Sequence, residues 1–303
     1  MKRRDFLKLS IGASISTLIN NSCYIPNENT IFPFGTNSKK YNKRYFKLLD
    51  HFVKNNKDYL SNYFKKIDQY LIDYKNSSRK YKIKNEDKLK DLIKPLRNTI
   101  EFVTRDNLSD KQIFLLHGKS NQLFNKLLER ILRNNTGASF MNKIILKTNH
   151  LSLNLIIHEY GHSMDNKLNI INYLIDKKEK IRAEMVAEYH ELYMGYYITK
   201  LWNKEIGQDI LDQASINKSD LNHYSTIKNS IQKNTKYENA RFFNLALLND
   251  FKMDFDKFRK YLINNNQKKV FNKLQNIEKK SGSLKEIILE GQNKLKDIIK
   301  ELK

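Results

Sequence analysis

The residues best suited to chemistry form one short motif, His158-Glu159-Tyr160-Gly161-His162. Side chains four residues apart on a helix share one face and lie about 6 Å apart along its axis, so the two imidazoles can bind one metal ion. Neutral imidazole suits zinc. Glu159 is turned about 100° from His158, where a carboxylate can take a proton from a zinc-activated water. The motif predicts a catalytic zinc site with His158 and His162 as ligands and Glu159 as the general base.

The sequence around this motif predicts a buried helix. Residues 151–157, Leu-Ser-Leu-Asn-Leu-Ile-Ile, are apolar on nearly every side of a helix. Two histidines and a glutamate in such a helix would be costly to bury without a metal ion. The sequence context therefore supports the zinc site.

A third ligand is expected from a second helical stretch, residues 181–191. This stretch carries Glu184 and Glu188 one turn apart, followed by Glu191. Carboxylate oxygen is an established zinc ligand, so the residues alone leave three candidates for this position.

The complete pattern, His-Glu-x-x-His followed after 21 residues by Glu, resembles the gluzincin zinc metallopeptidases. The local form Ala-Glu-x-x-Ala-Glu is similar to that of their lethal-factor-like branch, and the resemblance covers roughly residues 110–200. It implies that Glu184 is the third ligand and that Glu188 is the hydrogen-bond partner of His158. The metzincin branch is excluded, because it needs a third histidine where Leu168 stands.

The group that would stabilise the oxyanion is not fixed by the sequence. The lethal-factor-like branch has a tyrosine seven residues before the ligand glutamate, and Lys177 occupies that place here. Tyr173, His223 and Tyr224 are the candidates. The remaining histidines have no partner pattern and are expected to be surface or hydrogen-bonded residues: His51, His117, His150 and His190.

The elements that must position the motif are expected to be mainly helical. The chain has 9 Gly and 3 Pro in 303 residues, which argues against a turn-rich β fold. The predicted class is mainly α (α+β), a zincin-like domain with a short mixed sheet beside the motif helix and with helical segments on both sides. A break is expected at Pro95. The expected elements are strands at 99–104, 112–116 and 139–148, with a helix at 119–133.

This reading divides the chain into five parts. They are a signal segment at 1–23, a linker at 24–40, an N-terminal helical region at 41–98, the catalytic domain at 99–262 and a C-terminal helical segment at 263–303. The last segment carries a helical seam of Leu284, Ile288, Leu295, Ile298 and Leu302, which we expect to dock on the body of the protein or on a second copy.

The N-terminus predicts export. The run Arg3-Arg4-Asp5-Phe6-Leu7-Lys8 resembles a twin-arginine signal. The apolar stretch after it, residues 9–19, is too short and too polar to span a bilayer. Cys23 is the only cysteine, so no intrachain disulfide can form, and its place after the leader makes it the candidate for lipidation and membrane attachment.

The net charge of +23, from 56 Lys and Arg against 33 Asp and Glu, is expected to be a solvated surface. An anionic surface or nucleic acid is the other explanation, although no specific nucleic-acid partner is expected.

The sequence therefore predicts an exported zinc metallopeptidase, an endopeptidase with one Zn²⁺ per chain that acts on peptides or proteins. Two alternatives stay open. One is a basic helical binding protein with a structural metal or none, and the other is a zinc amidase for a non-protein amide such as peptidoglycan.

Overall fold

The structure is a computed structural model that describes residues 39–77, 86–106, 112–116, 137–140, 143–147, 150–165, 167–168, 173, 175–213, 226–233 and 236–302. Residues 45–303 form one compact unit. The signal segment with Cys23, the helix expected at 119–133, and His117, His223 and Tyr224 lie outside the described residues. The predicted divisions within the chain stay predictions.

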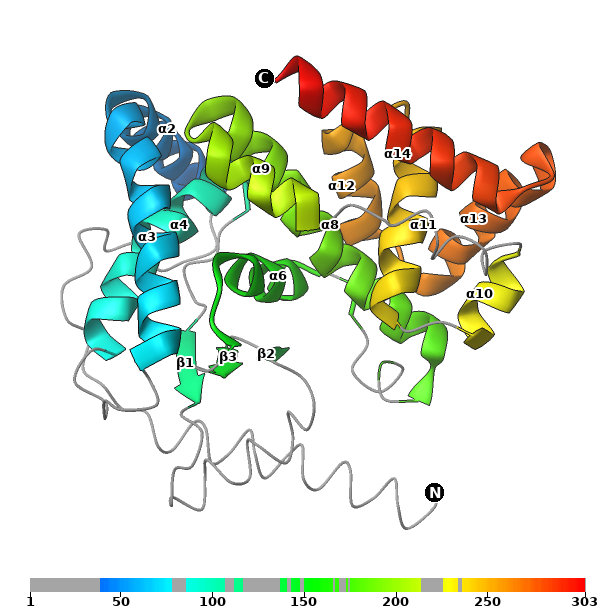
Figure 1. The fold of residues 1–303 in the computed structure, drawn as a ribbon, viewed down its shortest axis with the longest axis horizontal. Coiled ribbons are helices and arrows are strands. Elements are labelled where there is room, and N and C mark those ends of the chain that lie inside the picture. The colour runs from blue at the N-terminus through cyan, green and yellow to red at the C-terminus, as the bar shows by residue number, and fades with distance from the viewer. Residues whose placement is uncertain are drawn as a thin grey trace, which may run out of the picture. The chain divides into compact units, whose positions relative to one another are not determined.

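The described part of the chain is mostly helical, which confirms the expectation of a mainly helical protein (Figure 1). Its helices are α2 (Lys39–Asn55), α3 (Lys57–Ser77), α4 (Glu86–Thr104), α6 (Leu153–Ser163), α8 (Lys177–Leu201), α9 (Lys204–Gln213), α10 (Ile227–Lys233), α11 (Lys236–Asp250), α12 (Phe255–Asn264), α13 (Gln267–Ser281) and α14 (Leu284–Glu301). Its strands are β1 (Gln112–Leu116), β2 (Gly137–Phe140) and β3 (Lys143–Lys147). Among these described helices, none is both long and apolar enough to cross a membrane.

The three strands form a small mixed sheet in the order β1-β3-β2. Strand β1 pairs in parallel with β3, Ile113 opposite Ile144, and β2 pairs antiparallel with β3, Ala138 opposite Ile145. The single strand expected at 139–148 is therefore wrong, because residues 137–140 and 143–147 form two separate strands that pair antiparallel with each other. Strand β2 lies at an edge of this sheet, and β3 lies at its centre.

The strand expected at 99–104 is also wrong, since these residues form the last turns of α4. Ile93, Leu96 and Ile100 are all buried, and their spacing is that of one helix face. The hydroxyl of Thr99 donates to the carbonyl oxygen of Leu96 at 2.7 Å, which satisfies it within the helix. Pro95 lies inside α4 without breaking it, and its ring nitrogen forgoes one hydrogen bond. Packing of this helix face therefore outweighs the local alternation.

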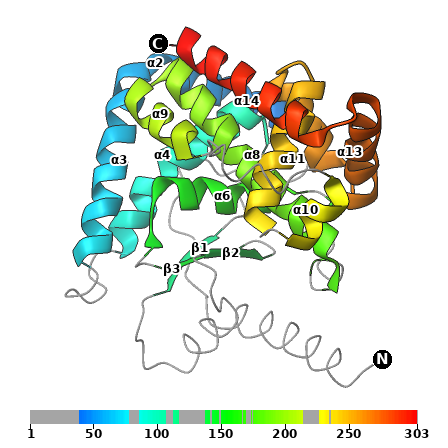
Figure 2. The same ribbon diagram turned by 45° about the vertical axis from the view of Figure 1, so that its right-hand side comes forward.

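Helix α6 carries the motif and lies between the sheet and α8 (Figures 1 and 2). It begins after Ser152, whose side-chain oxygen accepts the backbone N–H of Leu155 at 3.2 Å. Helix α8 begins after Asp176, whose carboxylate accepts the N–H of Lys178 at 2.9 Å. Almost all of α8 from Glu179 onward is buried, so its polar side chains must find partners inside the protein.

The C-terminal seam docks on the body of the chain. Leu284, Ile288 and Leu295 are buried, and α14 packs against α11. The side-chain amide of Asn249 on α11 donates to Glu290 on α14 at 3.0 Å. This contact confirms the expectation of docking within the chain.

Candidate metal centre

Helices α6 and α8 bring together three of the predicted side chains. One carboxylate oxygen of Glu184 lies 3.4 Å from Nε2 of His158 and 3.4 Å from Nε2 of His162. One ligand atom from each of the three residues lies within 4.8 Å of the other two. The two imidazole rings stand nearly perpendicular, with centroids 4.8 Å apart. Residues 26 positions apart in sequence thus converge on one point.

This convergence depends on a close crossing of α6 and α8 at Gly161. A Cβ atom at Gly161 would lie 2.8 Å from Cα of Ala187 and 2.9 Å from Cβ of His190. Both neighbours belong to the α8 backbone or stand directly on it, so they cannot move aside independently of the helix. The absence of a side chain at Gly161 therefore sets the distance between the histidines and Glu184.

We expect Gly161→Ala to destabilise the protein by about 1–3 kcal/mol, the usual cost of overpacking a core. In a solvent-exposed helix, a glycine-to-alanine change would instead stabilise the protein by about 1 kcal/mol. Gly195→Ala is the matched control, because the atoms nearest its Cβ are side-chain atoms of Ile210 and Leu211, at 3.0 Å, and not backbone atoms of a crossing helix. Denaturant unfolding of both variants is the measurement. A Gly161→Ala protein as stable as wild type would show that the crossing can widen.

The hydrogen-bond partner of His158 is Glu191, not the predicted Glu188. Nδ1 of His158 and a carboxylate oxygen of Glu191 are 2.6 Å apart. Helix geometry explains the difference: Glu191 lies about 20° round α8 from Glu184, whereas Glu188 lies about 40° away on the other side. Glu184 and Glu191 can therefore contact the two nitrogens of the same imidazole.

Glu188 instead pairs with Arg241 on α11. Nε of Arg241 donates to a carboxylate oxygen of Glu188 at 2.6 Å. Burial raises the pKa of Glu188 to about 7, and the charge of Glu191 adds to the rise, while Arg241 opposes it. Glu188 thus connects α8 to α11 beside the metal centre.

The two carboxylates give His158 a polarised environment. Burial alone would lower the pKa of His158, but hydrogen bonds and charges from Glu184 and Glu191 outweigh it and hold the pKa well above the ordinary value. A carboxylate on Nδ1 fixes the orientation of a metal-binding imidazole and strengthens Nε2 as a ligand.

Glu159 is buried, 3% exposed, and lies against Gly137 at the start of β2. A Cβ atom at residue 137 would come within 2.6 Å of Oε1 of Glu159. Nothing in the local sequence indicates that residue 137 lies next to residue 159. The edge strand therefore defines the space that the Glu159 carboxylate occupies.

We expect Gly137→Ala to lower kcat at least tenfold while zinc content is unchanged. The added methyl group displaces the end of a flexible side chain, so Glu159 moves but the histidines do not. Misplacement of a reacting group by about 1 Å can cost on the order of 100-fold in rate. Kinetics and metal analysis on one preparation are the measurement. Unchanged kcat would mean that Glu159 has room to adjust.

Two tyrosines lie at the centre. The hydroxyl of Tyr173 donates to Oε1 of Glu184 at 3.4 Å, so one of the oxyanion candidates is placed beside a predicted ligand. Tyr237 on α11 was missed by the sequence analysis, and its ring centroid lies 6.2 Å from that of His158. Tyr237 is 37% exposed, so it borders the solvent. Lys177 stands where the lethal-factor-like branch has its oxyanion-stabilising tyrosine. Its side chain donates to the carbonyl oxygen of Gln232 at 3.4 Å, so Lys177 does not replace that tyrosine.

A buried ionic cluster joins the end of α6 to the start of α8. Arg182 bonds Asp165 at 2.5 and 3.0 Å and Glu179 at 2.8 and 3.1 Å, and the side chains of its two closest ion pairs are fully buried. Asp165 follows His162 by three residues, and Arg182 precedes Glu184 by two. The cluster therefore holds two ligand-bearing segments in register.

The three described histidines outside the metal centre are surface or hydrogen-bonded residues, as expected. His190 is buried, and burial, followed by the charge of Arg259, lowers its pKa to about 3, so it is neutral. Its Nδ1 lies 2.7 Å from the carbonyl oxygen of Val186, and its Nε2 accepts from Arg259 at 3.2 Å. His51 and His150 are exposed.

The donor set of the centre fits a zinc ion. Two imidazole nitrogens and one carboxylate oxygen are the three protein ligands of a common catalytic zinc site, which leaves a fourth position for water or substrate. A second group, His158, Glu188 and Glu191, also has atoms within 4.8 Å of one another. Its members already bond to one another or to Arg241, so this group surrounds and supports the first.

Comparisons of the chain with protein-family models, curated proteins and solved structures find no match.

Proposed function

We propose that the protein is a zinc-dependent metallopeptidase that hydrolyses internal peptide bonds. The observation that carries the proposal is the convergence of His158, His162 and Glu184, one ligand atom each within 4.8 Å, with Glu159 on the next position of the same helix. Under this proposal these three residues hold one zinc ion per chain. Glu191 positions His158, the role that the gluzincin resemblance implied for Glu188.

When bound, zinc supplies a Lewis acid that polarises the scissile carbonyl and makes water more acidic. The carboxylate of Glu159 accepts the proton from the attacking water and later passes it to the leaving amine. The hydroxyl of Tyr173 is the donor we assign to the developing oxyanion, because it already reaches Glu184.

Strand β2 supports a peptide as the substrate. It pairs with β3 on one side and forms an edge of the described sheet, and an edge strand can pair with an extended peptide. Its first residue, Gly137, lies against Glu159. A substrate paired along β2 would therefore run beside the general base. Together with the α6–α8 pair, this arrangement supports a zincin-like domain.

We further propose that the chain is exported by the twin-arginine route and attached to the membrane through Cys23. The support is the Arg3-Arg4 motif and the position of Cys23 after the leader.

The two alternatives differ from this proposal in what the site must do. A structural zinc site is closed by four protein ligands, whereas each ligand group found among the described residues has three members. An amidase acting on a non-protein amide would use the same residues and would differ in its substrate alone.

Removal of the metal provides the test. Full-length protein loaded with one equivalent of zinc should cleave members of a peptide library, lose this activity after chelation and regain it when zinc is returned. Mass spectrometry of the products locates the bonds that are cut. Stoichiometric zinc without cleavage of any peptide would refute the peptidase assignment, and cleavage of peptidoglycan fragments in that case would identify the amidase.

A further inference from the structure

Two groups of potential metal ligands share His158. The first consists of His158, His162 and Glu184, and the second of His158, Glu188 and Glu191. Nε2 of His158 lies 3.4 Å from a carboxylate oxygen of Glu184, and Nδ1 lies 2.6 Å from a carboxylate oxygen of Glu191. The two groups therefore lie on opposite nitrogens of one imidazole, and each could hold a metal ion of its own.

The second group has the composition of a metal site. Carboxylate oxygen and imidazole nitrogen are ligands of zinc, and carboxylates also suit Mn²⁺. The side chains of Glu188 and Glu191 are only 4% and 8% exposed. Two buried carboxylates close to each other are costly unless a cation compensates their charge. The second group therefore needs a positive charge beside it.

Arg241 on α11 supplies that charge. Its Nε donates to one carboxylate oxygen of Glu188 at 2.6 Å, and a terminal nitrogen donates to the other oxygen at 3.5 Å. Among the described residues, Arg241 is the one lysine or arginine that forms an ion pair with Glu188 or Glu191. A guanidinium stays charged at any ordinary pH. Both oxygens of Glu188 are thus bonded to a permanent cation.

Helix α11 keeps Arg241 in this position. Tyr237, Arg241 and Asn244 follow one another at intervals of four and three residues, so they share one face of the helix. The ring of Tyr237 lies 6.2 Å from that of His158, and the amide of Asn244 donates to the carbonyl oxygen of Met185 at 2.9 Å. Contacts one turn before and one turn after Arg241 therefore hold the α11 backbone beside the metal centre.

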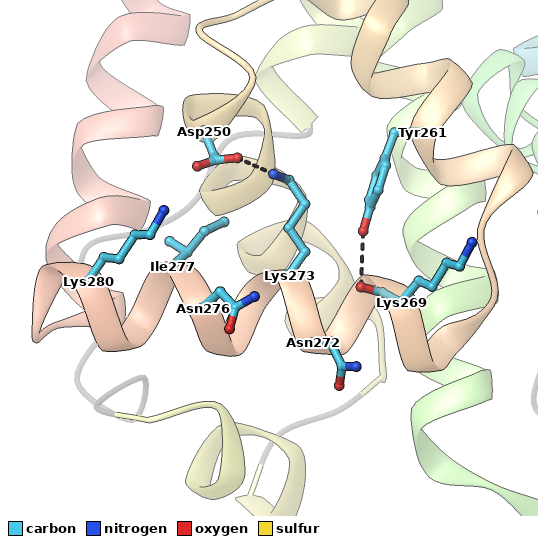
Figure 3. Close-up of a pocket in the computed structure, with 8 residues that line it drawn as sticks. All are labelled: Asp250, Tyr261, Lys269, Asn272, Lys273, Asn276, Ile277 and Lys280. Carbon is cyan, nitrogen blue, oxygen red and sulfur yellow. Dashed lines mark hydrogen bonds and ion pairs between the residues drawn. The ribbon is translucent and has the colours of Figure 1, made fainter.

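An ordinary surface ion pair has a different environment. Lys273 and Asp250, which line a groove beside α13, lie 2.5 Å apart and are 31% and 37% exposed (Figure 3). Exposed pairs of this kind contribute little to stability. Asp250 belongs to neither ligand group found among the described residues, whereas Glu188 is a buried member of one. Arg241 is therefore placed as a counterion of the metal centre and not as a solvated surface charge.

We propose that Arg241 limits the centre to one metal ion. Its guanidinium is a fixed cation that keeps Glu188 out of the ligand set, where a second ion would otherwise be bound by Glu188, Glu191 and Nδ1 of His158. The Nε2 side of His158 is left for the one zinc ion of the proposed function, on which this inference rests. Arg241 is thus a positioning residue that acts through Glu188.

Removal of the charge of Arg241 should admit a second ion. We expect the full-length R241M variant to bind about two zinc ions per chain after dialysis against free zinc, where wild type binds about one. R241K keeps a cation beside Glu188 and should bind about one. E188Q/R241M should also return to about one, because the second group has then lost a carboxylate. Elemental analysis measures the metal content, and native mass spectrometry counts the ions on each chain.

R97M is the matched control. Arg97 is 25% exposed and forms an ion pair at 3.5 Å with Glu101, which is buried. Glu101 belongs to neither ligand group found in the described part of the chain, so R97M should keep about one zinc ion. A second ion in R97M as well would overturn the proposal, because any buried glutamate that loses its arginine would then attract metal.

The stability of R241M gives a second measurement. Loss of one partner of a buried ion pair destabilises a protein, so circular dichroism follows unfolding of R241M with and without zinc. The second ion should replace the missing charge and raise the midpoint of unfolding. An R241M chain that stays unfolded with excess zinc would overturn the proposal.

The metal counts separate failure of this inference from failure of the proposed function. One zinc ion on both wild type and R241M would overturn the role of Arg241 and leave the proposed function intact. Two ions on E188Q/R241M would overturn the action through Glu188. Wild type that binds no zinc would refute the proposed function, and the inference with it.

Discussion

Replacing Glu159 by Gln is expected to lower kcat by about 10²–10⁴-fold while the protein keeps one zinc ion. The amide has the shape of the carboxylate but cannot accept a proton, and loss of a general base costs a factor in this range. The three predicted ligands are untouched, so the affinity for zinc should stay within a few-fold of wild type. Turnover of a cleaved peptide and zinc content must be measured on the same sample.

Glu238→Gln is the matched control for this experiment. Glu238 is an exposed glutamate on α11, next to Tyr237, and the change removes the same charge near the centre without touching the reacting atoms. It should retain kcat within about threefold. Activity of Glu159→Gln within about tenfold of wild type would show that another group accepts the proton.

Replacing Glu184 by Ala is expected to weaken zinc binding by far more than 100-fold, since it removes one of three ligands. Glu191→Ala should weaken zinc binding by about 10- to 100-fold, the usual cost of losing a carboxylate that orients a metal-binding histidine. Glu188→Ala should have a smaller effect than Glu191→Ala, because Arg241 rather than His158 is its partner.

Competitive titration with a chromophoric chelator ranks the three variants on one scale. Circular dichroism of the metal-free proteins checks that each variant is folded. A larger loss for Glu191→Ala than for Glu184→Ala would make Glu191 the ligand and would reverse the order of the two carboxylates along α8.

The sequence predicted the parts of the centre that lie within a few turns of one helix. His158, Glu159 and His162 follow from the helix period alone. Glu184 lies on another helix, and the choice of it over two neighbouring glutamates came from the family resemblance. The partner of His158 was predicted wrongly because it depends on how α8 is rotated against α6, which sequence spacing does not define.

Contacts between distant segments could not be predicted either, because sequence spacing does not define how elements pack against one another. The approach of Gly137 to Glu159 arises where the sheet edge meets α6, and the approach of Tyr237 to His158 arises where α11 packs on α8. At residues 99–104 the local sequence pattern gave a wrong prediction, because packing determines the structure there. Its local alternation favours a strand, but three buried side chains at helical spacing and satisfied threonine hydroxyls stabilise the helix.

The Arg182 cluster has a consequence for how the protein exchanges its ion. The bonds from Arg182 on α8 to Asp165, just after α6, join the two ligand-bearing segments without any metal, and Glu179 on α8 also pairs with Arg182; breaking a buried pair of this kind costs about 3–5 kcal/mol. The chelated chain should therefore remain folded with its three ligand side chains already assembled. Reloading then requires dehydration of the ion, not refolding. A protein of this design would behave as a reversible metal receptor, stabilised by free zinc in proportion to the logarithm of its concentration above the dissociation constant.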